Sequence, residues 1–243
     1  DTLEDLADSV NYALEQHGYP QRTLDEVRSF VGNGAANLIS RSVPTGEAFE
    51  PVLATFQSYY RTHSQVKTRP YPGILEMLET VKAKYPVAVV SNKPDPAVKL
   101  LCASLFGDIY ALGETADCPR KPAPDMLYKA MKALGADRIV YVGDSEVDVL
   151  TAQNAGVPCL SVLWGFRDRE VLEEAGGIYL CDRVEDSIDR LETIKDSFAY
   201  TLRSGLNSGI ERYFAVLRSN PKEEARYAKQ TAKRDALIKK GRN

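Results

Sequence analysis

Two carboxylates lie four residues apart in the segment Gly143-Asp144-Ser145-Glu146-Val147-Asp148, directly after an apolar run at 139–142. An apolar run that ends in Gly-Asp is typical of a buried strand, and α/β proteins bind ligands at the carboxyl edge of their strands. A helix that begins near Ser145 would turn Asp144 and Asp148 toward one point. Carboxylate oxygens suit Mg²⁺, so the spacing favours a metal site. The alternative is an aspartate that caps a helix.

Two further segments carry groups that suit phosphate. A second apolar run at 87–90 leads into Ser91-Asn92-Lys93-Pro94, where a hydroxyl and an amide stand before a helix opened by proline. An ordinary turn is the alternative there. The third segment, Lys121-Pro122-Ala123-Pro124-Asp125, precedes a helical stretch at 126–134. Its lysine is either a surface charge or a cation held against phosphate.

Taken in chain order, the segments at 91–94, 121–125 and 143–148 resemble motifs II, III and IV of the haloacid dehalogenase-like hydrolases. The stretches Tyr71-Pro72-Gly73 and Trp164-Gly165-Phe166-Arg167 are similar to those of the phosphoglycolate phosphatases with a small helical cap within that family. The resemblance covers about residues 1–192. It implies a Mg²⁺-dependent hydrolase of phosphomonoesters, and the substrate would be a small anionic metabolite such as 2-phosphoglycolate.

The resemblance also implies a role for each candidate residue. Ser91 and Asn92 would hold the phosphoryl oxygens, and Lys121 would neutralise charge on the phosphate and the nucleophile. Ser91 and Lys121 are therefore the catalytic candidates, and Ser91, Asn92 and Lys121 the substrate-binding ones. Asp144 and Asp148 are the metal candidates, with Asp148 either a ligand or close behind one.

One part of the family pattern is missing from the printed sequence. Family members open with a strand that ends in Asp-x-Asp-Gly-Thr, which supplies a nucleophile and a general acid/base, and no Asp-x-Asp occurs here. The segment from Asp1 to Asp8 resembles the one that follows this motif. We therefore expect the native first strand to lie upstream, the intact enzyme to form a phosphoaspartyl intermediate, and the chain as printed to be inactive or weakly active.

Other functions remain open at this point. Another phosphatase of the family, a pyrophosphatase or a phosphoglucomutase would share the same motifs. A protein of a different class, a non-catalytic phosphate-binding or scaffold protein, would keep the phosphate pocket without a nucleophile. An Asp-x-Asp-Gly-Thr encoded just before Asp1 would favour the enzyme.

The elements that must position these residues fall into three expected regions. Residues 1–70 are helical and form the cap, with capping boxes predicted at Thr2 with Asp5 and at Thr23 with Glu26. Residues 71–192 alternate helices and strands, which predicts an α/β core with a doubly wound parallel sheet and all strand ends at one edge. Its expected strands are 87–90, 109–112, 139–142, 159–163 and 178–180, and its last helix is 184–191.

The third region, residues 193–243, is predicted to be a helical extension of unknown role. Residues 219–243 hold eight Lys and Arg against three acids, a net charge of +5. Two smaller questions stay open. Gly32-Asn33-Gly34 is either an edge that faces the active site or a plain turn, and Trp164 either shapes a pocket or fills the core.

Composition limits the class of protein. The chain has 243 residues, of which 44% are hydrophobic, enough for a sizeable core. It has four cysteines and no Cys-x-x-Cys pair, which favours reduced thiols and a cytoplasmic location. We expect a small phosphorylated metabolite as the partner, neither membrane nor nucleic acid, and a monomer or a homodimer.

Overall fold

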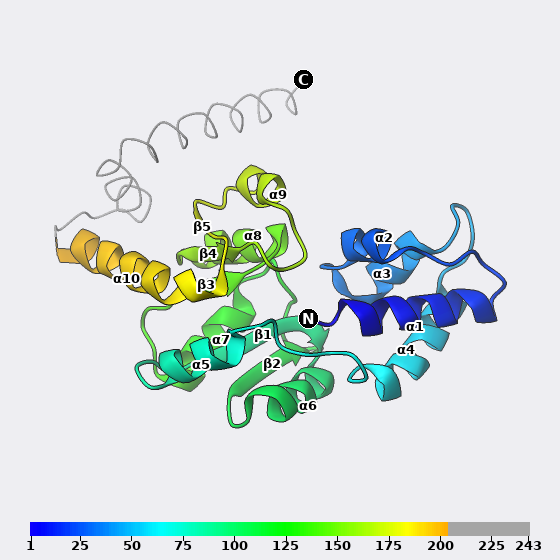
Figure 1. The fold of residues 1–243 in the computed structure, drawn as a ribbon, viewed down its shortest axis with the longest axis horizontal. Coiled ribbons are helices and arrows are strands. Elements are labelled where there is room, and N and C mark those ends of the chain that lie inside the picture. Colours follow the sequence, from blue (N-terminus) through cyan, green and yellow to red (C-terminus); the bar gives the residue numbers. More distant parts are fainter. Residues whose placement is uncertain (204–243) are drawn as a thin grey trace, which may run out of the picture.

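The structure is a computed structural model that describes residues 1–203 of the chain. Its first part is a group of helices, the blue and cyan elements beside the strands in Figure 1. They are α1 (Leu3–Gln16), α2 (Leu24–Phe30), α3 (Gly34–Ser42) and α4 (Glu50–His63). Apolar residues from all four helices meet in one core, among them Val10, Leu14, Val27, Ile39 and Phe56. Helical spacing of these residues gives each helix one apolar face, which explains why the helices pack together.

The helix starts confirm one predicted capping box and correct the other. At α2, the Thr23 hydroxyl accepts from the Glu26 amide while the Glu26 carboxylate accepts from the Thr23 amide. At α1, the Thr2 side chain makes no capping bond. Asp5 instead accepts hydrogen bonds from the Lys67 and Thr68 amides, so this buried carboxylate ties α1 to the chain that leaves α4.

The second part alternates strands and helices, as expected. Its strands are β1 (Ala88–Pro94), β2 (Tyr110–Glu114), β3 (Tyr141–Gly143), β4 (Cys159–Val162) and β5 (Tyr179–Cys181). Its helices are α5 (Ile74–Lys82), α6 (Asp95–Phe106), α7 (Asp125–Leu134), α8 (Glu146–Ala155), α9 (Arg169–Glu174) and α10 (Ser187–Arg203). The five expected strands are thus confirmed, with ends that differ by at most four residues.

Every strand pair is parallel, but the strands form two sheets instead of one continuous sheet. β1 pairs with β2, and β3, β4 and β5 pair in that order. Within residues 1–203, β1 and β3 each pair along one edge only. The two strands are accordingly less buried than their apolar sequences predict: Val142 is 42% exposed, and residues 88–91 are half-buried.

The end of the described chain corrects the start of one expected helix. A 3₁₀ turn, η1 (Val184–Asp186), occupies the start of the helix predicted at 184–191. α10 then continues past position 192, where the core was expected to end. The rest of the predicted extension, including the basic segment at 219–243, lies outside the described residues.

The cysteines and the helix lengths bear on the class of protein. All four cysteines are buried and unpaired. None of the helices within residues 1–203 combines the length and apolar character needed to cross a membrane.

Candidate active site

The two carboxylates of the first motif lie where β3 passes into α8. Ser145 has an extended backbone and caps α8, because its hydroxyl accepts a hydrogen bond from the Asp148 amide. The turn is tight: a Cβ on Gly143 would lie 2.2 Å from the Cβ of Asp148. Only glycine allows β3 to end against the first turn of α8, so the Gly-Asp sequence serves the packing of the corner.

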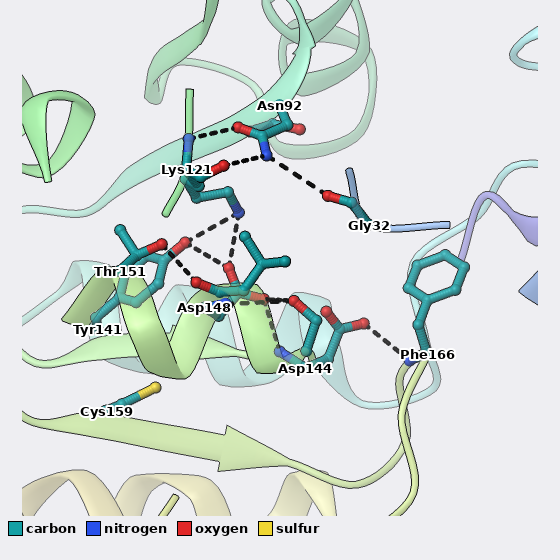
Figure 2. A network of polar contacts seen from close by, with 12 residues as sticks. Gly32, Asn92, Lys121, Tyr141, Asp144, Asp148, Thr151, Cys159 and Phe166 are labelled. Carbon is teal, nitrogen blue, oxygen red and sulfur yellow. Dashed lines mark hydrogen bonds and ion pairs between the residues drawn. The ribbon is translucent and has the colours of Figure 1, made fainter. Parts of the chain in front are cut away.

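Asp148 forms a buried ion pair with Lys121. Its Oδ1 lies 2.7 Å from Lys121 Nζ and accepts from the Tyr141 hydroxyl at 2.8 Å. Its Oδ2 accepts from the Ser145 hydroxyl at 2.6 Å and from the Asp144 amide at 3.2 Å. Both oxygens are therefore fully engaged, and Figure 2 shows these bonds converging on Asp148.

Charge in this pair holds both groups ionised. Burial opposes ionisation of the carboxyl, but the Lys121 ammonium outweighs burial and holds the pKa of Asp148 below its usual range. Burial also opposes the charge on the ammonium, and the Asp148 carboxylate again outweighs it and raises the pKa of Lys121. Lys121 is thus a permanent cation at the site.

Asn92 fixes the backbone that carries this lysine. Its Oδ1 accepts from the Lys121 amide at 2.8 Å, and its Nδ2 donates to the Lys121 carbonyl at 3.0 Å. Nδ2 also lies 3.5 Å from the carbonyl of Gly32, between α2 and α3. Figure 2 shows the amide bracketing the Lys121 peptide. The phosphate contact predicted for this side chain stays a prediction, while the observed role is to position Lys121.

Asp144 is the more open carboxylate. Its Oδ2 accepts from the Phe166 amide at 3.0 Å, whereas its Oδ1 accepts no hydrogen bond from a described residue. Burial and then the nearby Asp148 carboxylate raise the pKa of Asp144. A partly buried carboxylate with one unused oxygen, held beside a second negative charge, is a group that gains from a bound cation.

Ser91 lies next to this network on β1. Its hydroxyl accepts from the Lys93 amide at 3.2 Å and makes no hydrogen bond to Lys121 or the two aspartates. The structure therefore joins Asn92, Lys121, Asp144 and Asp148 in one set of contacts. Ser91 lies beside this set, next to Asn92 on β1.

The site suits a Mg²⁺ ion that is bound by the single carboxylate of Asp144 and not by a cluster of acidic side chains. Within the described part of the chain, no group of three or more His, Cys, Asp and Glu side chains gathers to bind a metal. Mg²⁺ usually keeps several waters and takes only one or two carboxylates together with substrate phosphate. The open Oδ1 of Asp144 meets that need, whereas the oxygens of Asp148 already have other donors.

Two arginines tie the helical part to the loop after β4. Arg28 of α2 donates to the carbonyls of Gly165 at 2.8 Å and Phe166 at 3.2 Å. In the other direction, Arg167 donates to the carbonyls of Arg28 at 3.1 Å and Val31. These crossed contacts bring the end of α2, and the Gly32 turn after it, against the site.

Arg167 also reaches the corner that carries the carboxylates. Its Nε lies 2.7 Å from Glu146 Oε2, and Glu146 stands between Asp144 and Asp148 in the sequence. The Gly32-Asn33-Gly34 segment thus faces the site, the first of the two readings left open. For Trp164, the core alternative holds, because its side chain packs against the core of β4, β5 and α10.

Sequence reasoning missed several of these residues for understandable reasons. Tyr141 lies inside an apolar strand, where a tyrosine is usually a core residue, yet its hydroxyl bonds the Asp148–Lys121 pair. Arg28 and Arg167 are 139 positions apart, and no local pattern indicates their contact. Gly165 could have been noticed, because it follows a strand in a motif already quoted.

In a chain preceded by the expected Asp-x-Asp-Gly-Thr strand, we expect Gly165→Ala to lower phosphate release by about 10–100-fold, since a displaced catalytic group costs that much. An added Cβ would lie 2.1 Å from Asp144 Oδ2, so the carboxylate has to move away from the Phe166 amide. Steady-state kinetics checks this. Gly156→Ala is the matched control: φ there is +69° and nothing lies within 4 Å, so it should cost about 1 kcal/mol of stability without the kinetic loss. Equal kinetic losses in both variants would contradict the explanation.

Comparisons with known proteins agree with this geometry. Residues 1–162 match the family model described as haloacid dehalogenase-like hydrolase. The chain is 34% identical over 180 residues to the phosphoglycolate phosphatase of Rhodobacter capsulatus, which covers 68% of this chain and 82% of that protein. It is 33% identical over 187 residues to the phosphoglycolate phosphatase of Neisseria meningitidis, with 72% and 80% covered.

A solved structure shows the same fold. The crystal structure of a proposed phosphoglycolate phosphatase from Lactobacillus delbrueckii subsp. bulgaricus superposes with a TM-score of 0.72 and 36% identity, covering 76% of this chain and 90% of that one. A haloacid dehalogenase-like hydrolase from Streptococcus pneumoniae, at 18% identity and a TM-score of 0.71, shares the fold over 78% and 91% of the two chains.

Proposed function

This chain belongs to the haloacid dehalogenase-like hydrolases, and we propose that it is a Mg²⁺-dependent phosphatase of a small anionic metabolite, with 2-phosphoglycolate as the first candidate. That it is a phosphatase follows from the family and its relatives. The metal, the substrate, the residue roles and the phosphoaspartyl route are the proposal.

One observation carries the proposal furthest. A buried lysine, paired at 2.7 Å with Asp148, lies beside Asp144, a carboxylate with one unused oxygen. Phosphoryl transfer needs fixed positive charge and a metal position near one point, because catalysis depends on placement and electrostatic stabilisation. A purely structural ion pair would not need the second, electrostatically strained carboxylate beside it.

The residues of the chain divide the work as follows. Lys121 supplies a fixed positive charge to the transferring phosphoryl group, and Asp148, Tyr141 and Asn92 hold that lysine in place. Ser91 offers a hydroxyl donor in the middle of β1. Mg²⁺ bound through Asp144 would supply further charge neutralisation at the phosphoryl oxygens. The nucleophile of the proposed phosphoaspartyl route is the first Asp of an Asp-x-Asp-Gly-Thr segment, which the extended chain described below supplies.

We also propose that residues 1–70 act as a cap over the core at 71–192. The crossed contacts of Arg28 and Arg167 support this, because they hold the turn after α2 against the loop beside Asp144. A cap in this place would exclude water from the phosphoryl group during the first step.

The test is phosphate release from 2-phosphoglycolate and a panel of sugar phosphates. The chain is assayed beside an extended chain, defined here as this chain preceded by a strand ending in Asp-x-Asp-Gly-Thr. We expect turnover by the extended chain, loss of turnover when the divalent cation is chelated, and recovery with Mg²⁺ but not Ca²⁺, which prefers more oxygen ligands. A folded extended chain that releases phosphate from no substrate would overturn the proposal.

A further inference from the structure

Lys93 is a cation near the site that has no acidic partner. It lies on β1 two residues after Ser91, and its amide donates to the Ser91 hydroxyl. Its side chain reaches α4, where Nζ donates to the Tyr60 hydroxyl at 3.0 Å and lies 5.3 Å from the centre of the Tyr60 ring. Tyr60 itself packs on the helical core, so the lysine is held between β1 and the helical part.

Three other cations near the site lie close to acids. Lys121 is paired with Asp148, and Arg167 with Glu146. Arg28 donates to two carbonyls and lies 3.9 Å from Asp168. No carboxylate of the described residues lies within ion-pair distance of Lys93 or of Arg120, but Arg120 donates to the Asn33 carbonyl at 3.4 Å, on the turn between α2 and α3. An ammonium has three donors, and the Tyr60 hydroxyl takes one, so Lys93 keeps donors for a ligand.

The start of the described chain lies near both Lys93 and Asp144, the candidate metal ligand. The backbone nitrogen of Asp1 donates to the Arg69 carbonyl, and Figure 1 places this end of the described chain beside β1, between the helical part and the strands. The Asp144 carboxylate and the Lys93 ammonium both lie close enough to act electrostatically on this nitrogen. Asp144 and Lys93 therefore both border one small region between the two parts.

We propose that Lys93, held by Tyr60, binds a carboxylate on the substrate, while Ser91 and Lys121 receive its phosphoryl group. This rests on the proposed function and adds the residue that selects the substrate class: short phosphorylated carboxylic acids. A single partly buried ammonium with free donors is matched by one anionic group. The Lys93 amide donates to the Ser91 hydroxyl, so the two residues are adjacent in space and both can contact one small molecule.

The test compares two substrates of equal length in the extended chain. 2-Phosphoglycolate carries the carboxylate, and 2-hydroxyethyl phosphate carries a neutral hydroxymethyl group in its place. We expect Lys93→Met to lower kcat/KM for 2-phosphoglycolate by about 10–100-fold, the usual effect of losing a charge-assisted hydrogen bond. The change should lie mainly in KM. For 2-hydroxyethyl phosphate we expect a change below about threefold, because that substrate makes no such bond.

Three variants control for structural effects. Lys93→Arg keeps the charge and should retain most of the preference for the carboxylate. Tyr60→Phe removes only the hydroxyl that holds Lys93 and should weaken the preference in part. Lys129→Met removes an exposed lysine paired with Asp117 on the surface and should change neither substrate.

The outcomes separate this inference from the function on which it rests. Equal losses on both substrates in Lys93→Met, or no loss on either, would overturn the role of Lys93 while leaving the phosphatase intact. If Lys93→Met lowers kcat/KM more for ethylene glycol bisphosphate than for 2-phosphoglycolate, Lys93 binds a second phosphate on the substrate instead of a carboxylate. If the parent hydrolyses none of the three, the proposed function fails and this inference fails with it.

Discussion

The Lys121→Met variant is expected to lose about 3–5 kcal/mol of its free energy of unfolding, because it leaves the Asp148 carboxylate buried without its cation. The two side chains are 12% and 6% exposed, so water cannot replace the lost partner. Tyr141 and Ser145 still donate to the carboxylate, and they keep the loss from being larger. Chemical unfolding with urea measures the effect.

The loss should depend on pH in a defined direction. In the parent, the pKa of Asp148 is lowered in the folded state, so its contribution is present at neutral pH and is lost as the pH falls through that pKa. Without Lys121, burial dominates and raises the pKa of Asp148. The deficit of the variant should therefore be largest near about pH 8 and shrink toward about pH 5. A deficit of the same size at both values would contradict the explanation.

A double variant separates charge from packing. Lys121→Met combined with Asp148→Asn leaves no unpaired charge and should recover most of the stability, as buried ion pairs replaced as a whole often do. Its activity should not return, because the phosphoryl group still lacks its cation. In the extended chain we expect a loss of about 10³-fold for both variants. Lys129→Met, an exposed control, should stay within about 0.5 kcal/mol of the parent.

The fold followed from the sequence because its signals are local. Each predicted strand is an apolar run bounded by turn residues, and each helix of the first part has its apolar residues at helical spacing. The ends were less well predicted, since hydrogen bonds between distant residues decide them. β1 extends to Pro94 because it pairs there with Glu114 of β2, and nothing in the segment 91–94 alone indicates this partner.

The proximity of the candidate residues was predictable from the sequence, whereas their individual contacts were not. The segments that motif order grouped are in contact in the structure: Asn92 bonds the Lys121 backbone, and Lys121 pairs with Asp148 beside Asp144. The different surroundings of the two aspartates were not visible in the sequence. Spacing alone treats the two aspartates alike, yet Asp148 is saturated by Lys121, Tyr141 and Ser145.

That difference between the two aspartates predicts opposite effects on stability and activity for Asp144→Asn. Burial and the Asp148 carboxylate both disfavour a negative charge at position 144. An asparagine there can still accept from the Phe166 amide, and it removes the repulsion. We expect the free energy of unfolding to rise by an amount on the order of 1 kcal/mol, while phosphatase activity of the extended chain falls below detection because the proposed metal ligand is gone.

The pH dependence and the metal response show whether the Asp144 charge is the cause. Since the pKa of Asp144 is raised in the folded state, its charge destabilises the parent above that pKa, and protonation relieves the strain as the pH falls through it. The advantage of Asp144→Asn should therefore be present at neutral pH and disappear in acid. Mg²⁺ should raise the Tm of the parent and leave the variant unchanged, because a ligand stabilises only the state that binds it. A variant that is less stable than the parent, or that still responds to Mg²⁺, would show that Asp144 is a helix-corner residue and that the metal binds elsewhere.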